Sequence, residues 1–320
     1  MSPADPGRAV RPWGWYVLYA AVMAALGYGV YAAAQRVDYN WHWERIPQYV
    51  VSFDGEEVVA PFDGFVKLAD DGRSLEVESL RTAERVRIDA FDRVLSGDGD
   101  LVFEGDAIAM RSGIAAGPLV WGLWLTLKLS ALSLLFALGI GVVAGLGRVA
   151  HNPAARALSA TYVELIRGTP LLVQIFIFYF FVGTVMNLSA FTAGVAALSV
   201  FTGAYVAEIV RAGIEAVPRG QMEAARSLGL SYPQAMRHVV LPQAFKKSLP
   251  SLAGQFINLI KDSSLVSVMA LTDLTKAGRE VVSSTFSPFE VWFTVAAMYL
   301  LLTGALSIWV RRLERRLAHD

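Results

Sequence analysis

The stretch "GQMEAARSLGLSYPQAMRHVVLPQA" spans Gly220–Ala244 and separates two of the most apolar parts of the chain. Pro218, just before it, is a plausible start for a helix, and Gly229 stands where a left-handed residue commonly ends one. Between them the pattern predicts a short helix with an apolar stripe. The residues expected to form that stripe are Ala224, Ala225 and Leu228.

A second short helix is predicted directly after this glycine. Ser231 followed by Gln234 has the spacing of a capping box, and Pro233 is tolerated in a first helical turn. We expect the helix to continue through "AMRHVV" and to end at Pro242. The stretch therefore predicts two helices joined at a fixed angle, a rigid knob suited to a socket on another protein.

The composition around this polar stretch is that of a membrane protein. The chain has 320 residues, of which 55% are hydrophobic and 18% charged, and its mean hydropathy is +0.45. A helix needs roughly 20 apolar residues to cross the hydrocarbon layer. Lys128 alone interrupts the apolar run Ile114–Gly147. The runs without any charged residue are Trp13–Gln35, Gly168–Ala207 and Val291–Val310.

Six membrane spans are predicted from these runs. Gly168–Ala207 is long enough for two spans, with a turn near Asn187–Phe191, and a further span is expected from about Ser248 to Thr272. The fold class is thus an all-α polytopic membrane protein. The expected parts are a cytoplasmic N-terminus at 1–12, a span at 13–35, an extracytoplasmic segment at 36–115, and a membrane domain at 116–317 that carries a cytoplasmic loop at 215–247.

The distribution of charged residues predicts the orientation of the chain in the membrane. The segment Arg36–Arg111 holds 17 acidic and 9 basic residues, although the whole chain has a formal net charge of +0. Lys and Arg favour the cytoplasmic side, and the basic clusters fall on alternate ends of the six spans. Both termini and the Gly220–Ala244 loop are therefore predicted inside, and the acidic segment outside. The clusters are Arg8 and Arg11, Arg148 and Arg156, Arg219, Arg226, Arg237, Lys246 and Lys247, and Arg311, Arg312, Arg315 and Arg316.

The first span has an alternative interpretation as a signal peptide, because Ala32–Ala34 is similar to a cleavage site. Its apolar run is longer than a signal core, which favours a membrane anchor. Both interpretations place the acidic segment, from Arg36 onward, outside. The absence of cysteine excludes disulfides and thiolate metal sites.

The outer segment has the pattern of a small β domain from about Val50 to Ile114. Asp-Gly pairs, a strong hairpin signal, separate stretches of alternating polar and apolar residues. These pairs begin at Asp54, Asp63, Asp71 and Asp98, and the stretches include Leu75–Ser79 and Arg85–Ala90. A domain of about 60 residues has a marginal core. It could be a passive spacer or a cap on the helices, or it could contact a partner.

The loop also carries a family resemblance. "EAARSLG" (Glu223–Gly229) followed by "LPQA" (Leu241–Ala244) resembles the EAA loop of type I ATP-binding-cassette (ABC) importer permeases. The likeness covers about Leu119–Leu317, and the family's five-helix core would account for five of the six spans. Three further stretches are similar to the polar amino acid branch, which handles histidine, glutamine, glutamate, arginine and opines: Tyr162–Phe176, Gly203–Ile214 and Asn258–Val268. "YNWHWERIPQYV" (Tyr39–Val50) resembles the lead-in before the first core helix, so the β domain would be an insertion between lead-in and core.

The resemblance implies partners and a role for the loop. The family docks this loop on a separate ATPase subunit, present as a dimer. Residues implied in that coupling are Glu223, Ala224, Ala225, Gly229, Leu241 and Pro242. The other expected partners are a second permease copy or paralogue, a periplasmic or lipid-anchored solute-binding protein, an amino acid substrate and membrane lipid, in a bacterial cytoplasmic membrane; nucleic acid is not expected. No G-x-x-x-x-G-K-[ST] motif occurs, so we expect this subunit to bind no cofactor and to be no enzyme, with ATP and Mg²⁺ used by the partner.

Charges inside a span are functional candidates. Lys261 and Asp262 could hold the two charges of a zwitterionic amino acid, or could instead fix their helix by pairing with other helices or lie at the membrane interface. Lys128 is expected to reach towards an interface. Glu208 and Arg211 are expected to support the loop. Further candidates for the substrate pathway are Ser263, Gln174, Thr202, Thr126 and Ser130.

Two other functional classes remain open from the residues. A secondary transporter or channel would need no ATPase, and the EAA pattern argues against it. A sensor or interaction protein would use the β domain for detection, but no recognisable signalling segment follows the last predicted span.

Overall fold

The computed structural model describes residues 13–36, 39–52, 56–69, 74–80, 84–89, 91–111 and 113–317. The chain divides into two compact units, Met1–Trp43 and Glu44–Asp320. The first unit contains helix α1 (Trp13–Arg36), which confirms the helix predicted over 13–35. Its 24 residues rise about 36 Å at 1.5 Å each, and only 6% of its most apolar 18-residue stretch is buried. A helix this apolar and this exposed is suited to lipid.

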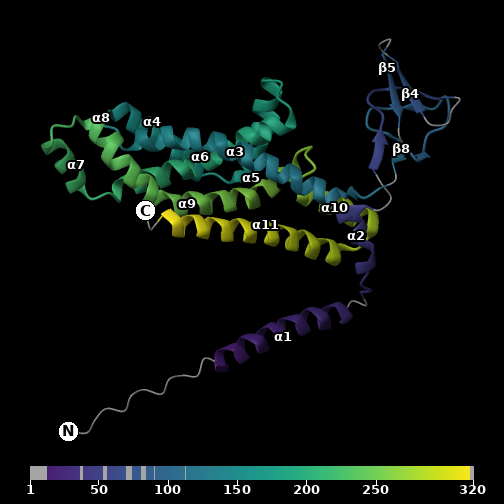
Figure 1. Cartoon of the computed structure of the whole chain (residues 1–320), viewed down its shortest axis with the longest axis horizontal. Coiled ribbons are helices and arrows are strands. Elements are labelled where there is room, and N and C mark those ends of the chain that lie inside the picture. The colour runs from purple at the N-terminus through teal and green to yellow at the C-terminus, as the bar shows by residue number, and fades with distance from the viewer. Residues whose placement is uncertain are drawn as a thin grey trace, which may run out of the picture. The chain divides into compact units, whose positions relative to one another are not determined.

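The second unit is mainly helical (Figure 1). A 3₁₀ turn over Trp43–Arg45 leads into it. Its α-helices are α2 (Pro47–Val50), α3 (Pro118–Arg148), α4 (Pro153–Arg167), α5 (Leu171–Phe176), α6 (Ala190–Glu215), α7 (Arg219–Ser227), α8 (Tyr232–Ala235), α9 (Leu241–Asp262), α10 (Leu274–Thr285) and α11 (Pro288–Leu317). Two π-helical segments, η2 (Ile177–Gly183) and η3 (Met236–Val240), and a 3₁₀ segment, η4 (Ser263–Val268), continue or link them. Figure 1 shows α3, α6, α9 and α11 running side by side.

The α3–α6 pair forms the centre of this unit, and glycines bring the two helices close together. A Cβ on Gly141 would overlap the Val206 side chain, and one on Gly145 would lie 2.7 Å from Val210. Small residues four apart are the usual means of close helix packing in membranes. Ser199 Oγ adds a hydrogen bond to the Ser133 carbonyl, 3.2 Å away. Around this contact, the buried apolar core includes Leu129, Ile175, Leu198 and Leu259.

The spans predicted from the sequence are confirmed in part. In the described part of the chain, four helices are long and apolar enough to cross a membrane: α1, α3, α6 and α11. The number is up to five if α4 and the α5–η2 segment, which meet at a bend of 103°, count as one broken span. The predicted turn near Asn187–Phe191 is present, because η2 is separated from α6 there and Asn187 has a left-handed φ of 51°.

The fifth predicted span in chain order differs from the structure in its bounds. The expected segment, about Ser248 to Thr272, corresponds to the second half of α9 and to η4. Helix α9 ends at Asp262, and it carries Lys246 and Lys247 near its start, so it is more polar than the four spans above. Its crossing of the membrane stays a prediction.

The inserted β domain consists of two small antiparallel sheets. One has the order β5-β4-β3-β7 and the other β2-β8-β6. The strands are β2 (Glu56–Val59), β3 (Gly64–Leu68), β4 (Ser74–Ser79), β5 (Arg85–Asp89), β6 (Arg93–Val94), β7 (Leu101–Val102) and β8 (Ala107–Arg111). Their inward side chains form a separate core around Val66, Leu75, Val77 and Ile108. The predicted β domain is therefore present, with the alternation that the sequence indicated.

The Asp-Gly pairs do not all act as hairpin turns. Gly64 is the first residue of β3, and the pair at Asp63 leads into that strand rather than joining two paired strands. Gly99 is left-handed (φ 85°), but it lies between β6 and β7, which belong to different sheets. For these two pairs the hairpin prediction was wrong. The pairs that begin at Asp54 and Asp71 lie outside the described residues.

Both ends of the β domain meet in one short strand pair. β1 (Val51–Ser52) and β9 (Ala115–Ala116) pair antiparallel, with Ser52 opposite Ala115. The Gly117 N–H donates to the Val50 carbonyl at 2.9 Å. A Cβ on Gly117 would overlap the Tyr49 carbonyl, so only glycine permits this approach. We call the β1–β9 pair the clasp. It holds entry and exit of the domain together directly before α3.

Candidate coupling loop and substrate pathway

Helix α7 begins and ends as the sequence predicted. Pro218 is its N-cap, and at its other end Gly229 has a φ of 87°. The Leu230 N–H donates to the Ala225 carbonyl at 3.2 Å, and the Gly229 N–H to the Arg226 carbonyl at 3.0 Å. These two bonds are the Schellman arrangement, in which a left-handed residue reverses the chain and satisfies the last helical carbonyls. The angle between the two predicted helices is therefore set by backbone geometry.

The second helix also starts as predicted but ends elsewhere. The Gln234 side chain accepts hydrogen bonds from both the backbone N–H and the hydroxyl of Ser231, at 2.9 and 2.8 Å, which confirms the capping box. Pro242, however, does not end this helix. It lies in the first turn of α9, where proline is tolerated, and the path runs helically through α8, η3 and α9. We call α7, the Gly229 turn and α8 the coupling hairpin.

The three residues predicted to form an apolar stripe on α7 are divided between a buried and an exposed surface. Ala225 is 4% exposed and packs inwards, whereas Ala224 is exposed and Leu228 is 85% exposed. The three residues therefore do not share one outward face. Glu223, Ala224 and Leu228 belong to the exposed surface, whereas the buried Ala225 supports the hairpin from inside. The Glu223 side chain has no hydrogen bond or ion pair to the described residues.

The hairpin stands on a packed base. Ile214, Val217, Val240 and Ala244 form a buried cluster under it, and Met222 of α7 packs against that cluster. Two polar contacts link the two sides of the loop: Lys247 Nζ donates to the Ala216 carbonyl at 2.6 Å, and Gln243 donates to Gln221 Oε1 at 3.1 Å. A force on the exposed tip would reach α6 and α9 through this base. Leu241 borders the same cluster.

Charged residues brace the C-terminal end of α6 next to this base. The Arg211 guanidinium donates to both Glu208 and Glu215 on its own helix. Glu208 also lies 3.8 Å from Arg148 at the end of α3. The expectation that Glu208 and Arg211 support the loop agrees with this position. The network ties the end of α3 to the helix that leads into the hairpin.

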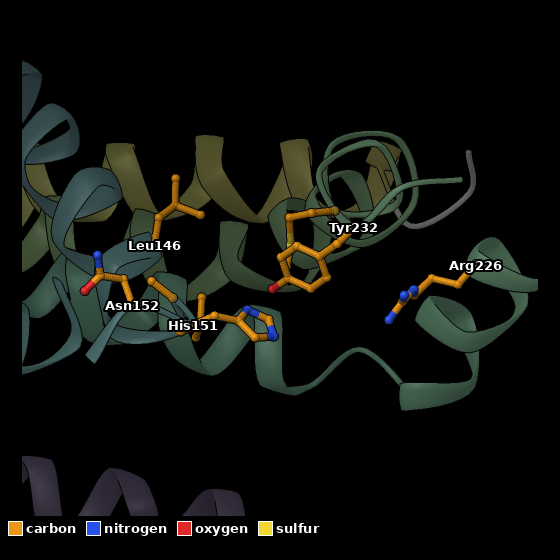
Figure 2. A pocket seen from close by; sticks show the side chains of 8 residues that line it. Leu146, His151, Asn152, Arg226 and Tyr232 are labelled. Carbon is orange, nitrogen blue, oxygen red and sulfur yellow. The ribbon is translucent and has the colours of Figure 1, made fainter. Parts of the chain in front are cut away.

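A cavity of about 580 Å³ opens between the coupling hairpin and the α3–α4 turn (Figure 2). Its walls come from the end of α3 and the turn on one side and from the hairpin and η3 on the other. The lining residues are Leu146, Val149, Ala150, His151, Asn152, Arg226, Tyr232 and Met236. The rings of His151 and Tyr232 meet edge to face, with centroids 4.6 Å apart. We call this space the hairpin cavity; sequence patterns could not indicate it, because its walls are far apart in the chain.

The residues predicted for a substrate pathway lie in different surroundings. Lys261 is exposed and Asp262 is half-buried at the end of α9. Neither side chain has an ion pair to another described helix, so the alternative in which they fix their helix finds no support within 4 Å. Ser263 is buried, and its hydroxyl donates to the Ile260 carbonyl at 2.8 Å. Thr202 is fully buried in α6, and its hydroxyl has no partner among the described residues.

Gln174 is engaged in the α4–α5 bend. Its side-chain amide donates to the carbonyl and hydroxyl oxygens of Thr169 and to the Ile166 carbonyl, at 3.2, 2.7 and 2.7 Å. These bonds satisfy carbonyls that the end of α4 leaves free. Of the polar atoms of the Gln174 side chain, Oε1 has no hydrogen-bond partner among the described residues. The structure thus gives this residue a bend-stabilising role that the sequence did not suggest.

Three more candidates lie towards the start of α3. Thr126 Oγ1 accepts from the Leu274 N–H at 3.1 Å and so joins α3 to α10. Ser130 is fully buried without a partner among the described residues. Lys128 is exposed, and its Nζ lies 5.2 Å from the centre of the Phe191 ring. Of the three, only Ser130 offers a buried polar atom without a partner among the described residues.

Asp273 is a buried residue that sequence reasoning missed. It is 0% exposed and caps α10 by accepting from the Thr275 and Lys276 N–H groups, both at 3.1 Å. Burial raises the pKa of its carboxyl, and the two backbone bonds oppose that rise. The preference of aspartate for N-caps, directly before "LTKAGREVV", could have identified it.

A membrane bundle centred on α6, with a capped hairpin protruding from its polar loop, defines the class of transport permeases. Residues 137–319 match the family described as the binding-protein-dependent transport system inner membrane component. The chain belongs to this family, whose members are transport subunits rather than catalytic ones. The resemblance to importer permeases that the loop indicated is thereby confirmed.

Similar proteins agree with this family. The probable glutamine ABC transporter permease protein GlnM of Bacillus subtilis is 45% identical over 197 residues, which are 61% of this chain and 91% of GlnM. The glutamine transport system permease protein GlnP of Escherichia coli is 39% identical over 202 residues, 62% of this chain and 92% of GlnP. A crystal structure of an amino acid ABC transporter with histidines matches at 42% identity and a TM-score of 0.59, over 62% of this chain and 94% of that one. The methionine transporter MetNI, at 22% identity and a TM-score of 0.57 over 62% of this chain and 96% of that one, shares the fold.

Proposed function

We propose that this chain is the membrane-spanning subunit of an ATP-driven importer of polar amino acids, of the glutamine type. The observation that carries the proposal is the coupling hairpin: a rigid, exposed tip on a packed base, in a chain 45% identical to a glutamine permease protein. The proposed assembly has two permeases, either two copies of this chain or one with a paralogue. An ATPase dimer uses ATP and Mg²⁺ on the cytoplasmic side, and a solute-binding protein delivers substrate from outside.

The orientation follows from the same proposal. The hairpin meets the ATPase in the cytoplasm, so both termini lie inside and the β domain lies outside a bacterial cytoplasmic membrane. The unpaired Glu223 and the exposed Ala224 and Leu228 are the contacts we assign to the ATPase. Gly229, Leu241 and Pro242 hold these contacts in place, and Ala225 supports them from below.

Vesicles containing the permease, its ATPase and its solute-binding protein provide the test. We expect uptake of labelled glutamine that requires ATP inside the vesicle, and the variant Glu223→Lys to lose uptake because reversing a docking charge costs affinity. The same charge reversal at an exposed residue away from the hairpin, Glu164→Lys on α4, serves as a matched control for insertion. Uptake that continues without ATP would instead identify a secondary transporter.

For the substrate pathway we propose Lys261 and Asp262, with the unpaired hydroxyl of Thr202 and the free Oε1 of Gln174 as further polar groups. A zwitterion needs a partner for each charge in a low-dielectric space, and the two α9 residues carry charges without other ion pairs in the described chain. Ser263 positions the helix end through its bond to Ile260.

Asp262→Asn separates this role from a structural one. We expect the complex to stay intact, while stimulation of ATP hydrolysis by loaded solute-binding protein falls at least about ten-fold, equal to about 1.4 kcal/mol. Size-exclusion chromatography monitors assembly, and Asn258→Asp, one turn earlier on α9, tests whether charge at that helix face matters by itself. A complex that dissociates on purification would assign the pair to structure.

A further inference from the structure

The hairpin cavity has a chemistry that the coupling contacts do not use. Its lining is mostly apolar and includes Leu146, Val149 and the thioether of Met236, and the rings of His151 and Tyr232 meet across it from its two sides. Figure 2 shows the Arg226 side chain reaching from α7 towards the space in front of these rings. Cations favour the faces of aromatic rings, and thioethers pack well against them. The combination suits an aromatic side chain from outside.

Arg226 is available for such a contact. It is exposed, and its guanidinium has no hydrogen bond or ion pair to the described residues. By contrast, Arg211 at the base of the same loop is held by two glutamates. A free guanidinium at the mouth of a cavity can stack on a ring and pair with a neighbouring carboxylate.

The surroundings indicate an acidic protein surface as the source of that side chain. Between Ala216 and Lys247 the chain has five basic residues and one acidic one: Arg219, Arg226, Arg237, Lys246 and Lys247 against Glu223. Charge complementarity therefore favours a partner surface rich in carboxylates. The cavity shares α7 with the surface assigned to the ATPase, so one partner can reach both places.

We infer that the hairpin cavity is a socket on the permease for an aromatic side chain of the ATPase subunit, flanked on that subunit by a carboxylate that pairs with Arg226. The inference rests on the proposed function and adds a second, reciprocal contact. The permease inserts its hairpin into the ATPase, and the ATPase inserts a ring behind the hairpin. A buried aromatic anchor in a pocket is the usual form of an interface hot spot.

This arrangement has a mechanical consequence. The cavity is bounded by the α3–α4 turn on one side and by the hairpin on the other. A side chain that fills it would stop the hairpin from collapsing towards α3 and would pass movement of the ATPase to both α3 and α6. A hairpin alone transmits force only through its own base.

The absence of cysteine makes a direct test possible, because an introduced thiol is the only one in the chain. Three variants are compared in the purified full-length permease: Ala150→Cys in the cavity wall, Leu228→Cys at the exposed hairpin tip, and Leu95→Cys in the β domain. The rate of maleimide labelling is measured alone, with the ATPase subunit, and in nanodiscs of anionic lipid without the ATPase. Leu95 is 45% exposed and reports any general slowing.

We expect the ATPase subunit to slow labelling of Ala150→Cys and Leu228→Cys at least about ten-fold and to leave Leu95→Cys unchanged. Protection of Leu228→Cys with unchanged labelling of Ala150→Cys would overturn the socket while the proposed function stands. If the ATPase subunit slowed labelling at neither Ala150→Cys nor Leu228→Cys, the docking of the ATPase itself would be overturned. Protection of Ala150→Cys by anionic nanodiscs alone would assign the cavity to a lipid head group and overturn the inference.

A cavity-filling variant tests the same socket from the opposite direction. Ala150→Trp places a ring of this chain in the space, so we expect the affinity for the ATPase subunit to fall about ten-fold. As a folding control, the Ala150→Trp permease without the ATPase should keep the unfolding midpoint and the elution volume of the parent chain. A correctly folded Ala150→Trp variant that binds the ATPase as tightly as the parent chain would overturn the inference.

Discussion

At the scale of single residues, Gly229 decides whether the hairpin can form. Its φ of 87° is in the left-handed region, and a Cβ there would meet nothing within 4 Å. The penalty of a side chain is therefore conformational, about 1–2 kcal/mol and more for a β-branched residue. We predict that Gly229→Val stays inserted but loses most ATP-coupled uptake in vesicles.

Gly220 provides the matched control for this prediction. It lies on the same short helix, also has open space where a Cβ would be, and does not have a left-handed φ. Gly220→Val should keep uptake within about two-fold of the parent chain, because valine has a slightly higher helix propensity than glycine and this position needs no left-handed φ. Equal activity of the two variants would show that the left-handed turn is not required.

At the scale of elements, the approach of α3 to α6 depends on glycines that face the partner helix. A Cβ at Gly141 would overlap Val206, whereas one at Gly139, two residues earlier, has no neighbour within 4 Å. We predict that Gly141→Leu destabilises the bundle by at least about 1–3 kcal/mol, the usual cost of overpacking a core. Unfolding in detergent, followed by size-exclusion chromatography after heating, measures this.

Gly139→Leu tests the same prediction on the other face of α3. Its side chain would point into open space and should leave the unfolding midpoint close to that of the parent chain. A bundle that tolerates leucine equally at both positions would mean that α3 and α6 are not in close contact.

Elements fixed by local signals were predictable from the sequence. The capping box at Ser231 and the left-handed Gly229 depend on residues within a few positions, so the pattern predicts them directly. The prediction for Pro242 was wrong because proline is compatible both with the end of one helix and with the first turn of the next. The hairpin prediction was wrong at Asp63 and Asp98 because Asp-Gly pairs also occur in turns that do not join paired strands.

Features that depend on distant residues could not be predicted from the sequence. Ala225 lies on the inward face of α7 that it shares with Met222, three residues earlier, and only the fold shows that this face packs on the buried cluster beneath it. Gln174 is a candidate for the substrate pathway because it is polar in an apolar run, and only the 103° bend brings its amide to Ile166. The hairpin cavity likewise exists only once the α3–α4 turn and α8 are adjacent.

At the scale of the whole molecule, the acidic β domain lies outside the family match, which covers residues 137–319. Several of its carboxylates are held by turn backbone: Asp98 accepts from the Leu68 N–H, Asp100 from Gly97, and Asp106 from Phe103. These hydrogen bonds hold the three side chains in fixed places. Lys67 and Arg85 both bind Glu78 and hold its pKa below the usual value, so the β3–β4–β5 face is largely charge-balanced. The acidic excess is therefore in the turns.

We predict that this domain orients the solute-binding protein by charge, mainly through the association rate. The clasp permits a clean deletion: residues 53–114 are removed, and Ser52 is joined to Ala115 by Asn-Gly, the preferred two-residue hairpin. Membrane insertion should survive. Half-maximal stimulation of the ATPase should need several-fold more solute-binding protein and should depend less on salt, since surface charges are screened over about 8 Å at physiological ionic strength.

A control for this deletion keeps the domain but removes charge, for example Asp92→Asn together with Glu104→Gln, two exposed residues. An intermediate loss would support steering by charge. An unchanged requirement for solute-binding protein in both variants would leave the domain as a spacer or as a cap on the helices.

The clasp also makes the β domain a natural label for counting subunits. Relatives such as GlnM and GlnP are matched over 91% and 92% of their length by about 200 residues, so they have no comparable insertion in the matched part. A transporter built from two copies of this chain would carry two such lobes, and one built with a paralogue of ordinary length would carry one. Because β1 and β9 tie each lobe to the first residues of α3, the lobes should stay visible in averaged electron micrographs of the assembled complex. The insertion would then report the stoichiometry of its own transporter without any added tag.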